Sequence, residues 1–408
     1  MSLSIVTLFL LPNLLALKEP ISITSISSVS ALGNTQKEIW KNYLHPKHFF
    51  SQKVFQNSSA WVAALPNAVR KEIEELRTSE IKYKKLDDSV LYAIFVSRKA
   101  SQQAGWEQGD SFGVNFGSSR GATQLFEKYH TKFLEYATSS TPVSPLTTLG
   151  NLSSWVAHDL KSRGPEISHS ITCSTALHAV LNGVAWIQSG LTDKFLVGGT
   201  EASLTEFTIA QMKAMKIYAK PYPNINHSTI ETYPCRALDL NKKSNTMIMG
   251  EGASAICLEK GNPSQTIAKI AGIGYASEPL KHGASMSANA DCLQQSMKMA
   301  LKVIDPNHVD VVVMHAPGTI KGDISELKAI SRIFCNKKPF LTTNKWKLGH
   351  TFGASGMLSL ELGVLMLQHQ QVIAVPFYIE QQRPKKLKNV LINAVGFGGN
   401  AVSILLTK

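Results

Sequence analysis

Three residues of the sequence combine a reactive side chain with neighbours small enough to admit a ligand: Cys173, His315 and His350. Cys173 precedes Ser174 and Thr175, His315 opens the segment HAPGT, and His350 lies within GHTFGASG. A cysteine thiolate attacks carbonyl carbons, and two histidines can donate hydrogen bonds to a developing oxyanion. The set favours acyl transfer through a thioester, although each residue alone is commonly structural.

Cys173 lies where a strand pattern changes into a helix pattern. Apolar and polar residues alternate over residues 167–172, which is typical of a strand. Apolar residues then recur with helical spacing at Leu177, Val180, Leu181, Val184 and Ile187. Because a helix N-terminus stabilises an anion, this position predicts a lowered pKa for the Cys173 thiol. This stretch alone leaves a reactive thiol and a buried structural cysteine equally open.

The two histidines occupy comparable junctions. His315 follows the apolar run at residues 309–314, which is typical of a strand in a covered sheet. His350 precedes an apolar helix expected over residues 354–368. A glycine turn at residues 396–399, after a strand expected over residues 390–394, can supply a further backbone donor.

The alternation of strand and helix patterns along the chain predicts an α/β layered fold. Two halves are visible, one ending near Lys260, but periodicity alone does not demonstrate a duplication. In the first half we expect a strand at residues 21–30 and a helix beginning near Gln36 that Thr35 caps. Residues 41–59 look irregular, and residues 67–77 and 87–103 look helical.

Composition narrows the class of protein. The chain has 408 residues, 44% of them hydrophobic, and its five cysteines are scattered without a CxxC pair. This pattern favours reduced thiols in the cytoplasm and argues against a disulfide framework or a metal site. The net charge of +13 suggests an acidic partner, whereas the absence of long basic runs with interleaved aromatics argues against nucleic acid.

The first residues need a separate interpretation. Residues 1–18 are mostly apolar but are interrupted at Pro12-Asn13, which leaves too short a run for a membrane span. The segment has no basic n-region and no clear cleavage site, so an N-terminal extension or a misassigned start is favoured over a weak signal peptide. No other segment has the pattern of a membrane span, and we expect no membrane partner.

Together the motifs resemble the elongating β-ketoacyl-acyl carrier protein synthases, which are condensing enzymes of the thiolase superfamily. The resemblance runs from Ile21 to the C-terminus, and its motifs stand in family order. They are TCS at residues 172–174, GGTEA at 198–202, GEGA at 250–253, HAPGT at 315–319, K at 345, GH at 349–350 and GFGG at 396–399.

The resemblance implies a thiolase-like fold of two similar βαβ-type halves with mixed sheets and buried central helices, in α/β/α/β/α layers. An N-terminal extension at residues 1–19 would precede a half with the nucleophile at residues 20–260. A second half with both histidines would follow at residues 261–408. A cysteine with two histidines matches elongating synthases, since initiating synthases carry asparagine at the second histidine position.

The resemblance also implies a mechanism. Cys173 would accept an acyl group as a thioester, and the N–H groups of Cys173 and Phe397 would form its oxyanion hole. His315 and His350 would stabilise the enolate formed when a malonyl thioester loses carbon dioxide, and that carbanion would attack the acyl group. Phe397, with Gly398 beside it, would gate the acyl pocket.

Four further residues receive supporting roles from the resemblance. Lys345 would be a charge behind the histidines, held by Glu326 or Asp323. Thr319 would support the reacting groups from behind, as Asp323 and Glu326 would. Ser359 stands where an acidic residue is usual, which argues against a bound structural cation.

The partner implied is an acidic acyl carrier protein, which would bring its own phosphopantetheine arm, so no separate cofactor is expected. Lys84 and Lys85 are the first candidates for docking it, and Lys213, Lys216 and Lys220 are weaker ones. Family members are usually dimers, so the chain is expected to form a homodimer or a heterodimer.

Several departures keep an alternative open. The family's HGTGT is HAPGT here, and Ala176 replaces a usual glycine. Such changes suit a synthase with an unusual substrate in fatty acid, polyketide or polyene-type synthesis. They also fit a partner subunit that shapes the pocket of a heterodimer, although the inactive chain-length factors lack the cysteine. A degradative thiolase is disfavoured because no cysteine follows Cys335.

Overall fold

The computed structural model describes residues 17–149, 151–220, 233–279, 286–378 and 381–408, so residues 1–16 of the expected N-terminal extension lie outside it. A large mixed sheet contains β1 (Ile21–Val29), β4 (Gly113–Gly117), β5 (Glu166–His169), β6 (Lys194–Glu201), β8 (Gly252–Lys260), β9 (Ala268–Ser277), β10 (Val311–Val313), β11 (Phe340–Thr342), β12 (Asn389–Gly396) and β13 (Asn400–Thr407). A small sheet contains β2 (Ser51–Val54), β3 (Ser59–Ala63) and β7 (Met249–Gly250).

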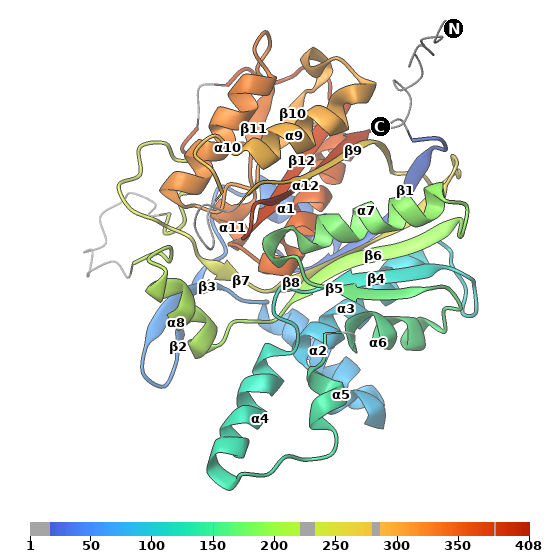
Figure 1. Ribbon diagram of the computed structural model, residues 1–408, viewed down its shortest axis with the longest axis vertical. Helices are drawn as coiled ribbons and strands as arrows, with labels where there is room; N and C mark the ends of the chain where they lie inside the picture. The colour runs from blue at the N-terminus through green and yellow to red at the C-terminus, as the bar shows by residue number, and fades with distance from the viewer. Residues whose placement is uncertain (1–16, 150, 221–232, 280–285, 379–380) are drawn as a thin grey trace, which may run out of the picture.

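The helices of the described residues surround these sheets (Figure 1). They are α1 (Gln36–Leu44), α2 (Asn67–Ser79), α3 (Asp88–Gln103), α4 (Thr123–Tyr136), α5 (Val143–Thr147), α6 (Asn151–Leu160), α7 (Thr175–Gln188), α8 (Glu206–Ala214), α9 (Asp291–Ala300), α10 (Ile320–Ile333), α11 (Lys345–Leu348) and α12 (Ser355–His369). Short 3₁₀ helices are η1 (Ile81–Tyr83), η2 (Thr172–Ser174), η3 (Leu301–Val303), η4 (Pro306–His308) and η5 (Phe352–Ala354).

The large sheet repeats one arrangement of five strands. Its order is β11-β10-β12-β13-β9-β1-β8-β6-β4-β5. In one half β4 pairs in parallel with β5 and β6, and the β6–β8 and β8–β1 pairs are antiparallel. In the other half β10 pairs in parallel with β11 and β12, and the β12–β13 and β13–β9 pairs are antiparallel. The halves meet at the antiparallel β1–β9 pair, so the duplication that periodicity only suggested is present in the structure.

The helices complete five layers, as the resemblance implied. α7 packs on β4 and β6, α12 packs on β10 and β12, and the two helices contact each other between the sheet halves. On the outer faces, α3 and α6 cover the N-terminal half, and α9 and α10 cover the C-terminal half. The order of layers is therefore α/β/α/β/α, and Figure 1 shows α12 at the centre.

The central helices are buried because their sequences are apolar on nearly every side. Residues 355–367 of α12 are all buried, which suits a helix enclosed between two sheets. α7 buries most of its surface as predicted, and Gly190 just beyond it has a left-handed φ of 75°. The predicted cap of α1 is also confirmed, since the Thr35 side chain accepts a hydrogen bond from Glu38 N.

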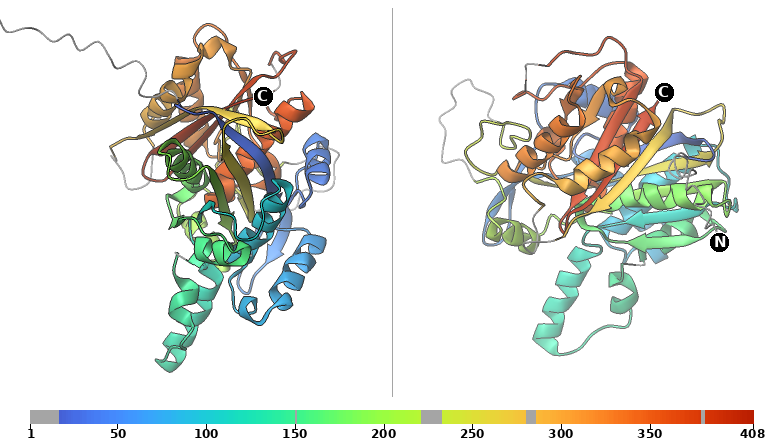
Figure 2. Two further views of the ribbon diagram at one scale, coloured as in Figure 1. Left: turned by 90° about the vertical axis from the view of Figure 1, so that its right-hand side faces the viewer. Right: turned by 45° about the horizontal axis from the view of Figure 1, so that its top comes forward.

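Two predictions about the first 140 residues were incomplete or wrong. Residues 41–59 are not irregular, because they contain the end of α1, all of β2 and the start of β3. Helix α4, which projects from the body in Figures 1 and 2, was not predicted at all. Its single buried residue is Thr123, and the apolar side chains of Phe126, Phe133 and Leu134 are exposed, so α4 lacks the buried stripe that marks a core helix.

Gly199 of β6 lies where the layers pack too closely to admit a larger side chain. A Cβ atom there would lie 2.6 Å from Ala176 Cβ and 2.6 Å from Gly353 O. Because these neighbours belong to the α7 and η5 segments and cannot move independently, Gly199→Val should lower the free energy of unfolding by about 1–3 kcal/mol. Urea unfolding measures the loss. Ala185→Val on the exposed side of α7 is the control and should cost less than about 1 kcal/mol; equal losses would contradict this account.

Candidate active site

The turn that carries Cys173 is tightly constrained. Cys173 lies in η2, immediately before α7, and Thr172 adopts a left-handed φ of 46°. The end of β12 presses against this turn, since a Cβ atom at Gly396 would lie 2.1 Å from Thr172 Oγ1. Only glycine fits there, and the close approach places the following Phe397 beside the cysteine turn.

Burial raises the pKa of the Cys173 thiol to about 12, and the nearby Glu201 carboxylate acts in the same direction. The prediction of a lowered pKa was therefore wrong. The side chain is only 4% exposed, and the loss of hydration outweighs the favourable charges of Lys345 and Arg120 and the effect of the helix start. The resting thiol is consequently neutral at physiological pH.

His315 is held by its backbone rather than by its ring. Glu326 of α10 accepts hydrogen bonds from His315 N at 3.0 Å and from Ala316 N at 2.8 Å. Asn393 of β12 donates to the same carboxylate at 3.2 Å. These contacts fix the turn after β10, in which Ala316 has a positive φ of 22°. Glu326 thus positions His315 through the main chain.

His350 is anchored by its own main chain to the small sheet. His350 N donates to Ile248 O at 2.7 Å, and its neighbour Gly349 has a φ of 71°. The rings of His315 and His350 lie edge to face with centroids 5.1 Å apart. His350 Nδ1 is buried and makes no hydrogen bond within the described part of the chain. The two rings are therefore in contact, although the residues lie 35 positions apart in the sequence.

Both imidazoles are neutral. Burial lowers the pKa of His350 to about 3, with a further contribution from the Lys345 charge. Burial likewise holds the pKa of His315 well below its usual range, assisted by His350 and Lys345. Neutral rings keep one N–H each as a donor and do not carry a proton that a carbanion could take.

Lys345 is buried close to this pair, but not in the expected contact. Its ammonium donates to Asn344 Oδ1 at 3.0 Å and to Ser359 Oγ at 3.2 Å. Asp323 instead pairs with Lys242 at 2.6 Å. Among the described residues neither Glu326 nor Asp323 makes the expected contact with the Lys345 ammonium. Glu326 acts on Lys345 only through its field, which favours the charged ammonium against the burial that lowers its pKa to about 8.

The remaining predicted residues lie around the site or away from it. Phe397 is 36% exposed in the β12–β13 turn, where Gly398 has a φ of 96°. Thr319 caps α10, since its Oγ1 accepts from Gly322 N at 3.2 Å. Asp323 accepts from Gly318 N at 3.0 Å and so holds the loop between His315 and α10. Lys84 and Lys85 are exposed after η1 and do not line either cavity at Cys173.

Two cavities meet at Cys173. The first, of about 330 Å³, is lined by Cys173, His315, His350 and Phe397, and we call it the histidine cavity. The second, of about 400 Å³, is lined by residues of α4 together with Cys173 and Phe397, and we call it the α4 cavity. The α4 cavity contains neither histidine. A group bound to Cys173 can therefore extend into one cavity while a second reactant occupies the other.

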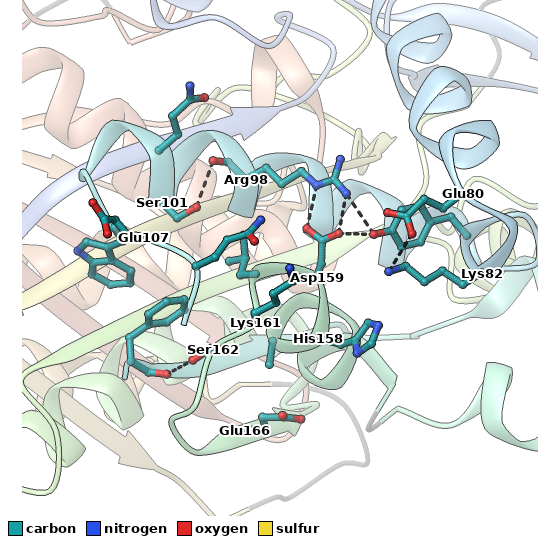
Figure 3. Close-up of a pocket in the computed structure, with 17 residues that line it drawn as sticks. Glu80, Lys82, Arg98, Ser101, Glu107, His158, Asp159, Lys161, Ser162 and Glu166 are labelled. Atoms are coloured by element: carbon teal, nitrogen blue, oxygen red, sulfur yellow. Dashed lines mark hydrogen bonds and ion pairs between the residues drawn. The ribbon is translucent and has the colours of Figure 1, made fainter. Parts of the chain in front are cut away.

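A larger surface hollow of about 990 Å³ lies elsewhere, between α3 and α6 (Figure 3). Its strongest charges already satisfy one another, because Arg98 donates to Asp159 at 2.6 and 2.8 Å. Across the described ranges, no three His, Cys, Asp or Glu side chains gather as a potential metal site. None of the helices described is long and apolar enough to cross a membrane.

Sequence reasoning missed the role of Glu201 at the end of β6. Its buried carboxylate accepts from Ser119 N at 2.9 Å, Gly353 N at 3.0 Å and Ser118 Oγ at 3.1 Å. Burial raises the pKa of Glu201 to about 7. The acidic residue inside GGTEA was the available signal, but its partners come from two distant loops. Arg120, which lines the α4 cavity, carried no signal at all.

Comparison with known proteins agrees with this geometry. Residues 18–263 match the family described as Beta-ketoacyl synthase, N-terminal domain, and residues 267–376 match its C-terminal domain. The chain is 25% identical to 3-oxoacyl-[acyl-carrier-protein] synthase 2 of Coxiella burnetii, covering 96% of this chain and 99% of the relative. It is also 25% identical to synthase 1 of Escherichia coli strain K12, covering 95% and 98%.

Solved structures share the fold. The ishigamide ketosynthase/chain length factor aligns with a TM-score of 0.81 at 18% identity, covering 96% of this chain and 99% of that one. A β-ketoacyl synthase from Burkholderia phymatum aligns with a TM-score of 0.79 at 22% identity, covering 96% and 99%.

The five-layer repeat and its buried cysteine and histidine pair define a thiolase-like condensing enzyme. The two family matches, which together span most of the chain, are more specific. The chain belongs to the β-ketoacyl synthase family.

The neutral state of the histidines is directly testable. Because burial lowers the pKa of His350 to about 3 and that of His315 well below its usual range, neither ring should gain a proton between pH 5 and 8. Their ring ¹³C–¹H NMR signals, assigned with His315→Gln and His350→Gln variants, should stay fixed over this interval. An inflection near pH 6.5 for either ring would contradict the assignment.

Proposed function

We propose that the protein catalyses decarboxylative Claisen condensation of an acyl thioester on Cys173 with malonyl-acyl carrier protein, giving a β-ketoacyl-carrier protein. The observation that carries this proposal is the meeting of two cavities at Cys173, only one of which holds both neutral histidines. That division supplies one place for the bound acyl chain and another for the malonyl unit. The reaction serves fatty acid or polyketide-type synthesis.

In the first half-reaction Cys173 Sγ attacks the carbonyl carbon of an acyl-carrier thioester. The N–H groups of Cys173 and Phe397 would receive the oxyanion, supported by the close packing of Gly396 against the cysteine turn. The carrier's phosphopantetheine thiol leaves with the proton that Cys173 loses. Since the resting thiol is neutral, it must give up this proton during the attack.

In the second half-reaction a malonyl thioester binds in the histidine cavity and loses carbon dioxide. The N–H groups of His315 and His350 stabilise the enolate oxygen, and the Lys345 charge behind them strengthens that field. The enolate carbon attacks the acyl carbonyl on Cys173, the C–S bond breaks, and the thiolate takes a proton from solvent. Neutral histidines suit this step because an imidazolium would protonate the carbanion.

Carrier protein docking draws on the chain's positive charge. We propose that Lys84 and Lys85 contact the acidic carrier, and that Lys216 and Lys321 assist at the mouth of the histidine cavity. Lys321 lines that cavity, and the neighbours of Lys216, Met215 and Ile217, line it too.

We further propose that the protein works in the cytoplasm, as free cysteines favour, and as a dimer. One related structure is titled as an acyl-carrier protein in complex with its ketosynthase, and others pair a ketosynthase with a chain length factor.

Acylation of Cys173 is the first test of the proposal. Incubation with acyl-carrier protein should add one acyl group to the chain, and Cys173→Ala should abolish the adduct. Intact-mass and peptide mass spectrometry measure both. Cys335→Ala removes the exposed cysteine and is the matched control, which should keep the adduct. An unmodified wild-type chain across short, long and unsaturated donors would favour the pocket-shaping subunit instead.

Docking is tested by charge reversal. The double variant Lys84→Glu, Lys85→Glu should raise KM for carrier-bound substrate by about threefold or more, because like charges slow the encounter. Turnover of a small pantetheine thioester should stay unchanged. The pair Lys385→Glu, Lys386→Glu reverses two equally exposed charges elsewhere and is the control. Equal effects of the two double variants would reject Lys84 and Lys85 as the docking residues.

A further inference from the structure

The α4 cavity contains a feature that a purely hydrocarbon acyl chain does not need. Among its lining residues, beside Phe126, Phe207 and Phe352, stands Arg120. An acyl group on Cys173 must extend away from the histidine cavity, where the second reactant binds, and so enters the space that Arg120 lines. A guanidinium is charged at every relevant pH.

Arg120 is positioned by the loop between β4 and α4. The preceding Ser118 and Ser119 are tied to Glu201 by hydrogen bonds of 3.1 and 2.9 Å, which fixes the start of this loop. The Arg120 guanidinium carbon lies 5.8 Å from the ring centroid of Phe352, within cation–π range. Its charge reaches Cys173, whose pKa it lowers against the effect of burial.

The guanidinium has donors without acceptors. It makes no hydrogen bond or ion pair within 4.0 Å to any residue that the structure describes. Glu127, the acid in the cavity lining, already accepts from Thr205 Oγ1 at 2.7 Å. Arg120 acts on Glu127 and Glu201 through its charge alone. Because Arg120 lines a substrate space, its five N–H donors are available to oxygen acceptors of the substrate itself.

We propose that Arg120 binds a carboxylate at the distal end of the acyl chain, so that the enzyme selects ω-carboxyacyl thioesters over methyl-ended chains. This inference rests on the proposed condensation at Cys173. A planar guanidinium matches a carboxylate with two parallel N–H···O bonds, which gives both affinity and direction.

The cavity also tolerates a charged chain end. In the single chain Phe126 and Phe207 at its rim are 59% and 61% exposed, so the cavity opens to the surface of that chain. A carboxylate held there keeps part of its hydration and avoids the large cost of full burial. The aromatic rim meanwhile packs the methylene groups between the thioester and the carboxylate.

The test measures the rate of Cys173 acylation by mass spectrometry. The donors are carrier protein loaded with ω-carboxyacyl chains of four to ten carbons and with methyl-ended chains of the same lengths. The wild type should prefer one or more carboxylated donors over their methyl-ended partners by about tenfold, which corresponds to about 1.4 kcal/mol. Arg120→Leu should abolish or reverse that preference, and Arg120→Lys should retain part of it. Lys128→Leu removes an exposed charge of α4 outside the cavity and should leave the preference unchanged.

The outcomes separate this inference from the proposed function. Acylation by methyl-ended chains with no carboxylate preference at any length would overturn the inference and leave the condensing function standing. A loss in Arg120→Leu that is equal for both series would assign Arg120 to tuning the Cys173 thiol, and would also overturn it. Absence of acylation by every donor would instead count against the proposed function.

Discussion

The site depends on backbone segments that approach each other too closely to admit a side chain. Each half of the repeat sends a strand end against the turn of the other half: Gly396 of β12 meets the η2 turn, and Gly199 of β6 meets the η5 turn. Both turns contain a left-handed residue, Thr172 with a φ of 46° and Phe352 with a φ of 41°, and both begin a buried central helix. The two half-sites are therefore packed against each other by one reciprocal contact.

This symmetry shows that only one copy of the turn carries a side chain that can react. Cys173 and Gly353 occupy the same place in the two turns, one residue after the left-handed position. In one half the side chain is the thiol that we propose as the nucleophile. In the other half the glycine makes room for Ser118 and Ser119, since a Cβ atom there would lie 2.4 Å from Ser119 N. Duplication supplies two matching turns, and the difference between Cys173 and Gly353 leaves a thiol in only one of them.

Features set by local patterns could be predicted from the sequence, whereas pKa values and contacts that depend on distant segments could not. The central helices, the caps and the set of Cys173, His315 and His350 follow from periodicity and from small neighbours, and the structure assembles them. The pKa of Cys173 could not be predicted from its helix, because the burial that raises it comes from η5 and β12, far along the chain. The partner of Lys345 was equally out of reach: Ser359 was a departure from a motif in sequence, but in space its hydroxyl accepts from the ammonium. α4 was missed because its apolar side chains are exposed, so it has no core-facing stripe to detect.

The positions of the charged side chains also differ between the two cavities. Burial keeps the thiol and both imidazoles uncharged. On the histidine side Lys345 is a buried cation that acts on both rings without lining the cavity, whereas Lys321 lines the cavity itself. On the other side Arg120 lies at the cavity wall itself, and its donors are open to whatever enters. A charge behind a reacting group changes the energy of any substrate that reacts there, whereas a charge at the wall distinguishes one substrate from another. The histidine cavity accordingly suits a reaction common to many acyl substrates, and the α4 cavity is where we propose that this enzyme selects its acyl substrate.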